Sequence, residues 1–358
     1  MATTSYGVNA NEAVKLWSRK LAHEALKKTY FKRFMGSGSD SMIQIKNDTQ
    51  KGKGDRVRIT LRMQLTGDGV QGDGTLEGNE EPLTTYTDDV VINQLRHAVR
   101  SGGEMSEQRI PFSVRDEAMQ GLSDWFADRW DTWMFRQLAG HTVTADTRYS
   151  GHNAITAPTR QIWTETGADS DDDLDNSGDT FTLTMIDRAV EKAKTGTTGS
   201  EPPIRPITVD GKSHYVVFLH PYQVTDLRTN TSTSTITWHD IQRAALSGNG
   251  SKDNPIFTGA LGVYNGCILH ESTRVPTGVS AAGTEVTGVR RALLCGAQAA
   301  AVCFGQGHDQ NSYDWFEQLF DYGNQLGVKA GCISGLKKLT WNSKDFGVIV
   351  MSSWAEAH

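Results

Sequence analysis

The sequence predicts an α+β fold, on three observations. A helix of about 25 residues is expected between Ser113 and Gly140. Extended segments are expected on both sides of a glycine-rich stretch at 67–78. From residue 181 to the C-terminus, short strands and helices alternate irregularly, which favours α+β over a doubly wound parallel sheet.

The helix after Ser113 has clear start and stop signals. Ser113 is a good N-cap, Asp116 and Glu117 follow in the first turn, and Gly140 is a suitable terminator. Apolar side chains cover most of the circumference of the segment. We therefore expect a spine helix that is buried against a sheet and its neighbours. A shorter helix is expected over 184–194, and a buried strand over 214–221 that ends at Pro221.

The segments around the glycine-rich stretch predict a long hairpin. Residues 55–65, "DRVRITLRMQL", alternate apolar and polar side chains, as a half-buried strand does. Residues 83–100, "LTTYTDDVVINQLRHAVR", are rich in threonine and β-branched residues and are expected to be extended. The glycines between them would form a flexible tip.

The N-terminal segment 12–34 has apolar residues at helical spacing and predicts an amphipathic helix. Its polar face carries an excess of positive charge, from Lys15, Arg19, Lys20, Lys27, Lys28, Lys32 and Arg33. Such a face is either simply solvated or a docking surface for an acidic partner or another copy of the chain.

Composition excludes several classes of protein. The net charge of -6 argues against a general nucleic-acid binder. Hydrophobic residues make up 37% of the 358, which is typical of a soluble globular chain. The four cysteines lack zinc spacing, so we expect reduced thiols, no metal and no disulfide framework. The N-terminus lacks a secretory signal and no apolar run is long enough to span a membrane, so folding in the cytosol is expected.

Gly67, Gly69 and Gly72 form a G-x-G-x-x-G after a predicted strand, which raises a nucleotide-dependent oxidoreductase as an alternative. That motif holds a pyrophosphate only when a helix follows it. Here Gly74, Gly78 and Pro82 follow and disfavour a helix. The stretch also carries carboxylates that would repel a phosphate: Asp68, Asp73, Glu77 and Glu80.

A calcium-binding surface module is the second alternative. Asp173, Asp175, Ser177 and Gly178 match the first half of an EF-hand loop, but Thr184 stands where a bidentate glutamate is needed. An acidic surface loop is the simpler interpretation. No nucleophile–base pattern, zinc-protease helix or P-loop is found, so no catalytic or cofactor-binding residues are predicted and a structural role is favoured.

Several stretches of the sequence are similar to the sequences of one protein family. These are "AVKLWSRKL", "MQLTGDGVQGDGTLEGNEEPLTTYTD", "QLRHAVRSGGEMSEQRIPFSVRDEA", "FTGALGVYNGCILHES" and "CGAQAAAVCFG". Together with the order of arm, hairpin, spine helix and mixed domain, they resemble the major capsid proteins of tailed double-stranded DNA bacteriophages of the phage N-four type. The resemblance runs from residue 14 to 305.

The resemblance implies the Hong Kong 97-type capsid fold and a subunit of an icosahedral shell made of pentamers and hexamers. It implies six parts: an N-terminal helical arm (1–40), an extended E-loop hairpin (41–110), the P-domain spine helix (111–140), an acidic irregular loop or insertion (141–180), an A-domain (181–290) and returning P-domain strands (291–358). Implied partners are other copies of the chain, packaged double-stranded DNA bound without sequence specificity, and decoration, scaffolding and portal proteins. The implied location is the virion, after assembly in the host bacterial cytoplasm.

Contacts between subunits are expected at the hairpin tip and the N-terminal arm. The acidic tip would meet basic residues on a neighbouring copy, since its carboxylates suit a basic partner better than a phosphate. The candidate contact residues are Trp17, Lys27, Lys28, Asp68, Asp73, Glu77, Glu80 and Glu81.

Overall fold

The computed structural model describes most of the chain in separate ranges. These are residues 21, 25, 29–47, 54–61, 69–80, 86–111, 113–143, 153–165, 167–175, 178–196, 201–209, 211–229, 262–305 and 313–357. Among them, no helix combines the length and the apolar character that crossing a bilayer requires.

Helices and strands are mixed along the chain, as expected for an α+β protein. The helices are η1 (Tyr30–Phe34), α2 (Glu104–Gln108), α3 (Val114–Ala139), η3 (Asp171–Asp173), α4 (Leu183–Thr195), α5 (Pro221–Thr229) and η5 (Asp321–Gly323). The strands of the first half are β1 (Met35–Gly36), β2 (Ile43–Lys46), β3 (Arg56–Leu61), β4 (Tyr86–Val91), β5 (Asn93–Arg100) and β6 (Gln161–Trp163). Those of the second half are β7 (Ile207–Val209), β8 (Lys212–Leu219), β9 (Val263–Tyr264), β10 (Cys267–Glu271), β11 (Thr277–Val279), β12 (Glu285–Cys295), β13 (Ala300–Phe304), β14 (Asp314–Phe320), β15 (Gln325–Lys338), β16 (Thr340–Trp341), β17 (Lys344–Asp345) and β18 (Val348–Trp354).

Two sheets organise the molecule. One has six strands in the order β1-β2-β13-β15-β14, with β5 on the other edge of β15. The other has eight strands along β6-β18-β12-β8-β10-β9, with β11 on β12 and β7 on β8. The eight-stranded sheet draws strands from three of the predicted ranges, 141–180, 181–290 and 291–358, because β6 and β18 pair beside β12.

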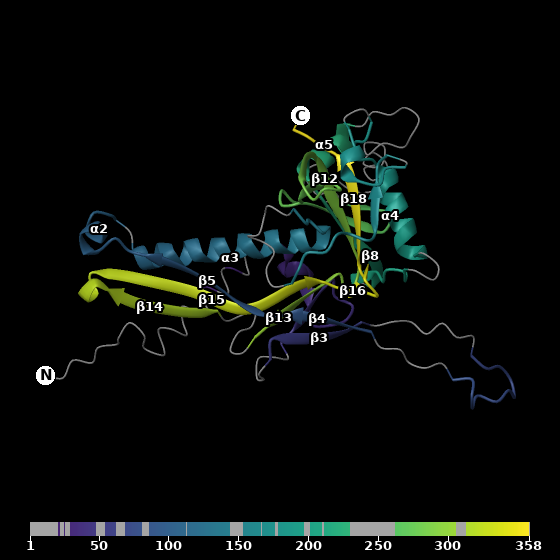
Figure 1. The fold of residues 1–358 in the computed structure, drawn as a ribbon, viewed down its shortest axis with the longest axis horizontal. Helices are drawn as coiled ribbons and strands as arrows, with labels where there is room; N and C mark the ends of the chain where they lie inside the picture. Colours follow the sequence, from purple (N-terminus) through teal and green to yellow (C-terminus); the bar gives the residue numbers. More distant parts are fainter. Residues whose placement is uncertain are drawn as a thin grey trace, which may run out of the picture.

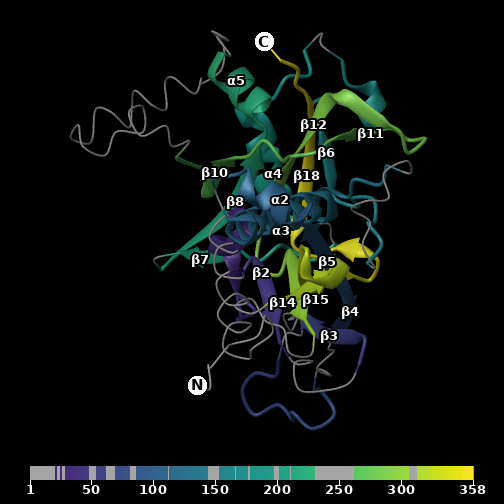
Figure 2. The ribbon, with the colours of Figure 1, turned by 90° about the vertical axis from the view of Figure 1, so that its left-hand side faces the viewer.

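Helix α3 runs along the β5–β15–β14 part of the six-stranded sheet and reaches the eight-stranded sheet at its C-terminal end, as Figures 1 and 2 show. In its N-terminal part it runs beside a ribbon of β5, β15 and β14, which we call the finger together with α2 and η5. Its side chains share one core with both sheets, for example Phe135 with Phe218 of β8 and Leu336 of β15. Helix α4 covers the opposite face of the eight-stranded sheet, with Ile186 packed near Val217 and Met351.

The predicted spine helix is confirmed with both caps. Ser113 accepts a hydrogen bond from the Asp116 N–H through its side chain, and Gly140 ends the helix with φ 60°. The amide N–H groups of Gly140 and His141 donate to the carbonyls of Gln137 and Arg136. This Schellman-type ending needs a left-handed residue, which explains the glycine.

Three shorter elements differ from expectation. The helix predicted over 12–34 does not continue to Phe34: Thr29 is extended, and Tyr30–Phe34 is a separate 3₁₀ helix. Helix α2 is not predicted, and neither is α5, which begins at the proline that ends β8. Proline at the first helical position has no N–H to leave unsatisfied, so it both stops the strand and starts the helix.

We predict that Gly140→Ala lowers the free energy of unfolding by about 2 kcal/mol or more, because a left-handed residue with a Cβ is disfavoured. That Cβ would also lie 2.6 Å from the Thr156 carbonyl oxygen and 2.7 Å from Pro158 Cδ. Chemical denaturation measures the change. The matched control is Gly121→Ala in the same helix, where a Cβ meets nothing within 4 Å. The control should stabilise the protein by roughly 0.5–1 kcal/mol; equal effects of the two substitutions would contradict the prediction.

Candidate assembly surfaces

The base of the predicted hairpin is a regular antiparallel pair. Strands β3 and β4 pair from Arg56 with Val91 to Leu61 with Tyr86. Val57, Ile59 and Leu61 are buried while the residues between them are exposed, which confirms the alternation predicted for this part of the strand. The buried side chains form a small core with β13, whose Cys303 faces them.

Asp88 fastens this base to the six-stranded sheet. Its carboxylate pairs with Lys337 of β15 and accepts hydrogen bonds from the N–H and hydroxyl of Thr340, at 2.9 and 3.0 Å. Because Asp88 is bound on several sides, the hairpin leaves the body in a defined direction. In Figure 1 it points away from the end that carries the finger.

The tip of the hairpin, residues 69–80, is exposed along its whole length. Two turns shape it, closed by hydrogen bonds from Gly74 N–H to Gln71 and from Asn79 N–H to Leu76. Gly69, Gly72 and Gly78 have positive φ, which glycine adopts without strain. A turn follows Gly72, and no helix occurs within 69–80, so the pyrophosphate site of a dinucleotide fold is not formed there.

The predicted contact residues fall into two groups. Asp73, Glu77 and Glu80 lie on the exposed tip, and Glu80 Oε2 accepts a hydrogen bond from the Gly78 N–H at 2.7 Å. The others lie outside the described residues: Trp17, Lys27, Lys28, Asp68 and Glu81. For the three described carboxylates, the structure establishes that they are exposed on the same tip.

A basic surface that sequence analysis misses lies on the finger. Arg96 and Arg100 of β5 are exposed, and their even spacing places them on one face of the strand. The Arg100 guanidinium lies 4.3 Å from the centre of the Phe320 ring. The local sequence does not distinguish these arginines from arginines on the polar face of any strand. The pairing of β5 with β15 shows that they lie on an exposed surface of the finger.

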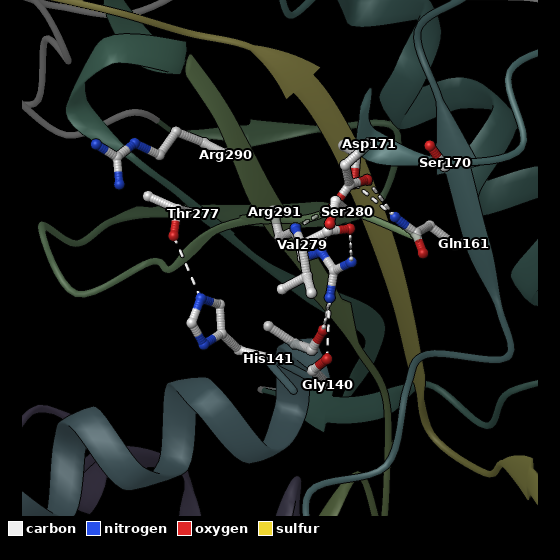
Figure 3. Close-up of polar contacts among 12 residues, drawn as sticks. Gly140, His141, Gln161, Ser170, Asp171, Thr277, Val279, Ser280, Arg290 and Arg291 are labelled. Carbon is white, nitrogen blue, oxygen red and sulfur yellow. Dashed lines mark hydrogen bonds and ion pairs between the residues drawn. The ribbon is translucent and has the colours of Figure 1, made fainter. Parts of the chain in front are cut away.

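A buried ion pair fixes the C-terminal end of α3, as Figure 3 shows. Asp171 Oδ2 accepts hydrogen bonds from Arg291 Nε at 2.7 Å and from the Val279 N–H at 2.9 Å. Its Oδ1 accepts from Gln161 Nε2 at 2.7 Å and from Trp163 Nε1 at 3.1 Å. The donors to this carboxylate therefore come from three strands, β6, β11 and β12, and supply the hydrogen bonds that a buried charge requires.

Arg291 completes the joint from the other side. Its Nη1 donates to the carbonyls of Ala139 and Gly140, at 3.2 and 2.9 Å, and its Nη2 donates to the Val279 carbonyl at 3.3 Å. A cation at the C-terminal end of a helix also interacts favourably with the partial negative charge of the helix dipole there. The pair thus links α3, β11, β12 and the segment before α4.

Asp131, near the middle of α3, holds the N-terminal segment. Its carboxylate accepts hydrogen bonds from the Tyr30 N–H at 2.9 Å and the Phe31 N–H at 3.4 Å, and Arg274 Nη1 lies 3.6 Å away. Burial raises the pKa of Asp131 to about 6. These backbone contacts also explain why the helix predicted over 12–34 breaks at Thr29.

In the EF-hand-like segment, the carboxylates of Asp173 and Asp179 accept hydrogen bonds from backbone N–H groups of the same segment. Asp173 Oδ2 accepts hydrogen bonds from the N–H groups of Asp169 and Ser170, and Asp179 accepts from the Asp175 N–H. Ser177 lies outside the described residues. Within the described part of the chain, no three metal-binding side chains are grouped as a cation site would need.

The four cysteines are free and buried. Burial raises the pKa of the Cys267 thiol to about 12 and that of Cys332 to about 11. Thiols held in the neutral form are poor nucleophiles, so these residues serve packing.

A family model described as phage capsid protein matches residues 4–357. The chain belongs to the phage capsid protein family. The capsid protein is therefore a virion component with a structural, non-enzymatic role, and its copies associate in a shell.

Individual relatives agree with this assignment. The major capsid protein of Pseudomonas phage KPP25 is 28% identical over 390 residues, which cover 97% of this chain and 96% of the relative. The solved capsid of Ralstonia phage GP4 is 34% identical, with a TM-score of 0.77 and 99% of each chain covered. The capsid of cyanophage Pam1 shares the fold at 22% identity, with a TM-score of 0.72 and 93% and 94% covered. The Hong Kong 97-type capsid fold is confirmed.

We predict that Asp171→Asn lowers the free energy of unfolding by about 3 kcal/mol, because it leaves the Arg291 guanidinium buried without a counter-charge. The side chains of Arg291 and Asp171 are only 5% and 0% exposed. Urea denaturation of the unassembled protein measures the loss. Asp89→Asn is the control, since Asp89 pairs with Arg58 on the open surface of the hairpin, where ion pairs contribute little. A loss no greater than the control's would contradict the assigned role.

A second prediction concerns pH. The pKa of Asp131 is higher in the folded protein than its ordinary value of 3.8, so the folded state takes up a proton that the unfolded state does not. Its contribution to stability therefore rises as the pH falls from 7 to 4, by about 2 kcal/mol. Burial lowers the pKa of His220 to about 4, so that group has the opposite effect between pH 6.5 and 4.

Comparing the native protein with Asp131→Asn over this pH range isolates the aspartate, because His220 is present in both. The difference in unfolding free energy should change by about 2 kcal/mol between pH 7 and 4. Parallel stability curves for the two proteins would show that Asp131 has no raised pKa.

Proposed function

We propose that this capsid protein assembles into the pentamers and hexamers of an icosahedral shell that encloses packaged double-stranded DNA. The observation that carries the proposal is that two projections of the molecule, the hairpin and the finger, point in opposite directions and expose side chains of opposite charge. The hairpin and the finger extend from opposite ends of the molecule (Figure 1). The hairpin tip exposes carboxylates and the finger exposes arginines.

Exposed carboxylates on one projection and exposed arginines on the other favour contact between copies in a ring. The tip of one copy, with Asp73, Glu77 and Glu80, would lie on the finger of the next, near Arg96 and Arg100. Such a head-to-tail contact is heterologous, and it closes into a ring when the rotation between copies is a whole fraction of a turn. Complementary charges also fix the register of the contact.

The glycines of the tip support the use of one contact in two kinds of ring. Neighbours in a pentamer and in a hexamer meet at slightly different angles. Gly69, Gly72 and Gly78 have positive φ and no atom within 4 Å of the position of a Cβ. An open tip built on such residues bends at little cost while its carboxylates keep their partners.

The remaining contact candidates belong to the same proposal. Asp68 and Glu81 would add acidic groups beside the tip. Trp17, Lys27 and Lys28 would supply apolar and basic contacts from the N-terminal arm.

We also propose the division into arm (1–40), E-loop (41–110), P-domain (111–140 and 291–358), acidic segment (141–180) and A-domain (181–290). DNA would be enclosed without sequence-specific binding, which fits the net charge of -6. Decoration, scaffolding and portal proteins would be further partners, and assembly would take place in the host bacterial cytoplasm.

Charge reversal tests the tip–finger contact. The double substitution Glu77→Lys and Glu80→Lys should reduce the fraction of protein in shells by about tenfold or more, since like charges that face each other cost several kcal/mol. Sedimentation and negative-stain microscopy measure the assembled fraction. The control is Glu356→Lys, an exposed glutamate near the C-terminus.

A second reversal sharpens the test. Arg96→Glu with Arg100→Glu should also block assembly, and combining both pairs of substitutions should restore part of it. Shell formation at the native level with the reversed tip, or no recovery in the combined variant, would count against the contact.

A further inference from the structure

The two exposed arginines of β5 lie beside glycines of β15. In the antiparallel register Arg100 is paired with Gly327 and Arg96 with Gly331, so each arginine is on the same face of the sheet as its glycine. A Cβ at Gly331 would lie 3.1 Å from Arg96 Cγ. Because Gly331 has no side chain, the stem of Arg96 lies close against the neighbouring strand.

Phe320 of β14 reaches across Gly327 to Arg100 from the other side of β15. A Cβ at Gly327 would lie 2.6 Å from Phe320 Cε2 and 3.2 Å from its Cδ2, so the ring occupies the space above this glycine. The Arg100 guanidinium lies 4.3 Å from the centre of the same ring. Three neighbouring strands thus each supply one member of a group that we call the arginine stack: Arg100, Gly327 and Phe320.

The arginine stack is on the face of the finger that is turned away from α3. His97, between the two arginines, packs on Trp125 of α3 with the ring centres 4.5 Å apart. Since successive side chains of a strand point to opposite faces, Arg96 and Arg100 point the other way. Both are exposed. The face that carries the two arginines is therefore not covered by α3.

Stacking leaves the hydrogen-bonding groups of Arg100 available to a partner. The contact with Phe320 uses the flat face of the guanidinium, while its N–H donors lie in the plane of the group and point outward. Lys329 of the same face is already paired with Asp314 at 2.6 Å, whereas within the described residues no ion pair involves Arg100. A guanidinium held in one orientation loses less entropy on binding, and its shape matches a carboxylate in a bidentate contact.

We infer that Phe320 is a positioning residue for the proposed contact between the finger and the hairpin tip. It holds the Arg100 guanidinium in the orientation that binds one carboxylate of the neighbouring tip in a bidentate manner. This role rests on the proposed function, because the partner is the acidic tip, whose Asp73, Glu77 and Glu80 are exposed and opposite in charge to the arginine. The strength of the contact then depends on the geometry of the guanidinium as well as on its charge.

Phe320→Leu tests this role, because it removes the ring and leaves every charge in place. The protein concentration at which half of the protein is in shells should rise about threefold, which is the size expected for one exposed cation–π contact. Phe320→Tyr keeps an aromatic ring and should restore the native concentration. Thermal melting of the unassembled variants checks that both are folded.

Arg100→Lys tests the part played by geometry without altering the backbone of the finger. Lysine keeps the positive charge but lacks the planar group that forms a bidentate contact with a carboxylate. The concentration for half assembly should again rise about threefold or more. The matched control is Arg109→Lys, an exposed arginine that follows α2, and it should assemble at the native concentration. Native assembly of Arg100→Lys would overturn the inference.

A double-mutant cycle separates positioning from a purely structural role of the ring. In an Arg100→Gln background, Phe320→Leu should cause little further change, because Phe320 acts through the guanidinium. A similar rise in both backgrounds, or no rise with Phe320→Leu alone, would show that Phe320 does not position Arg100. Shells of Arg100→Gln that form at the native concentration would instead show that the proposed tip–finger contact is wrong, and the inference with it.

Discussion

The buried ion pair between Asp171 and Arg291 fixes the geometry on which the other parts depend. It ties the last carbonyls of α3 to the eight-stranded sheet through bonds of 2.7–3.2 Å. Because α3 continues from this joint along the finger, the position of one helix end sets the direction in which the finger projects. Farther along α3, Asp131 holds the N-terminal segment against the helix by accepting a hydrogen bond from the Tyr30 N–H. A subunit that tiles a shell needs such a rigid frame, since angular errors at the joint grow with distance along the helix.

Charges in this capsid protein have two different environments. Buried groups such as Asp171 and Arg291, and the half-buried Asp88, have partners from several elements, so they determine the shape of the subunit. Exposed groups such as Glu77 and Arg96 are accessible to other molecules, and we propose that they bind neighbouring copies. The turns of the hairpin tip likewise lie where the subunit has few contacts of its own. Rigidity at the joint and glycine turns at the hairpin tip together suit the proposed use of one contact in both pentamers and hexamers.

Local signals in the sequence predict the elements well. The caps of α3 at Ser113 and Gly140, the alternation from Val57 to Leu61, and the strand before Pro221 depend on neighbouring residues and are found as expected. The break at Thr29 is missed because it depends on a carboxylate about 100 residues away. The arrangement of the eight-stranded sheet is missed for the same reason, since β18 pairs with β12 and β6 across long stretches of chain.

The assembly surfaces are only partly predictable for a related reason. The acidic tip can be recognised because its glycines and carboxylates are consecutive. The exposed arginines of β5 can be recognised as a surface of the finger only when the pairing of β5 with β15 is known. In the proposed assembly both surfaces meet neighbouring copies, and the sequence of one chain does not indicate where a neighbour lies.

Cryo-electron microscopy of shells assembled from the native protein tests the central claim directly, because it shows each hairpin tip beside its true neighbour. The carboxylates of Asp73, Glu77 and Glu80 should lie within ion-pair distance of Arg96 or Arg100 on the next copy in the ring, in pentamers and hexamers alike. A tip that rests on its own subunit, or on an acidic surface of the neighbour, would contradict the claim.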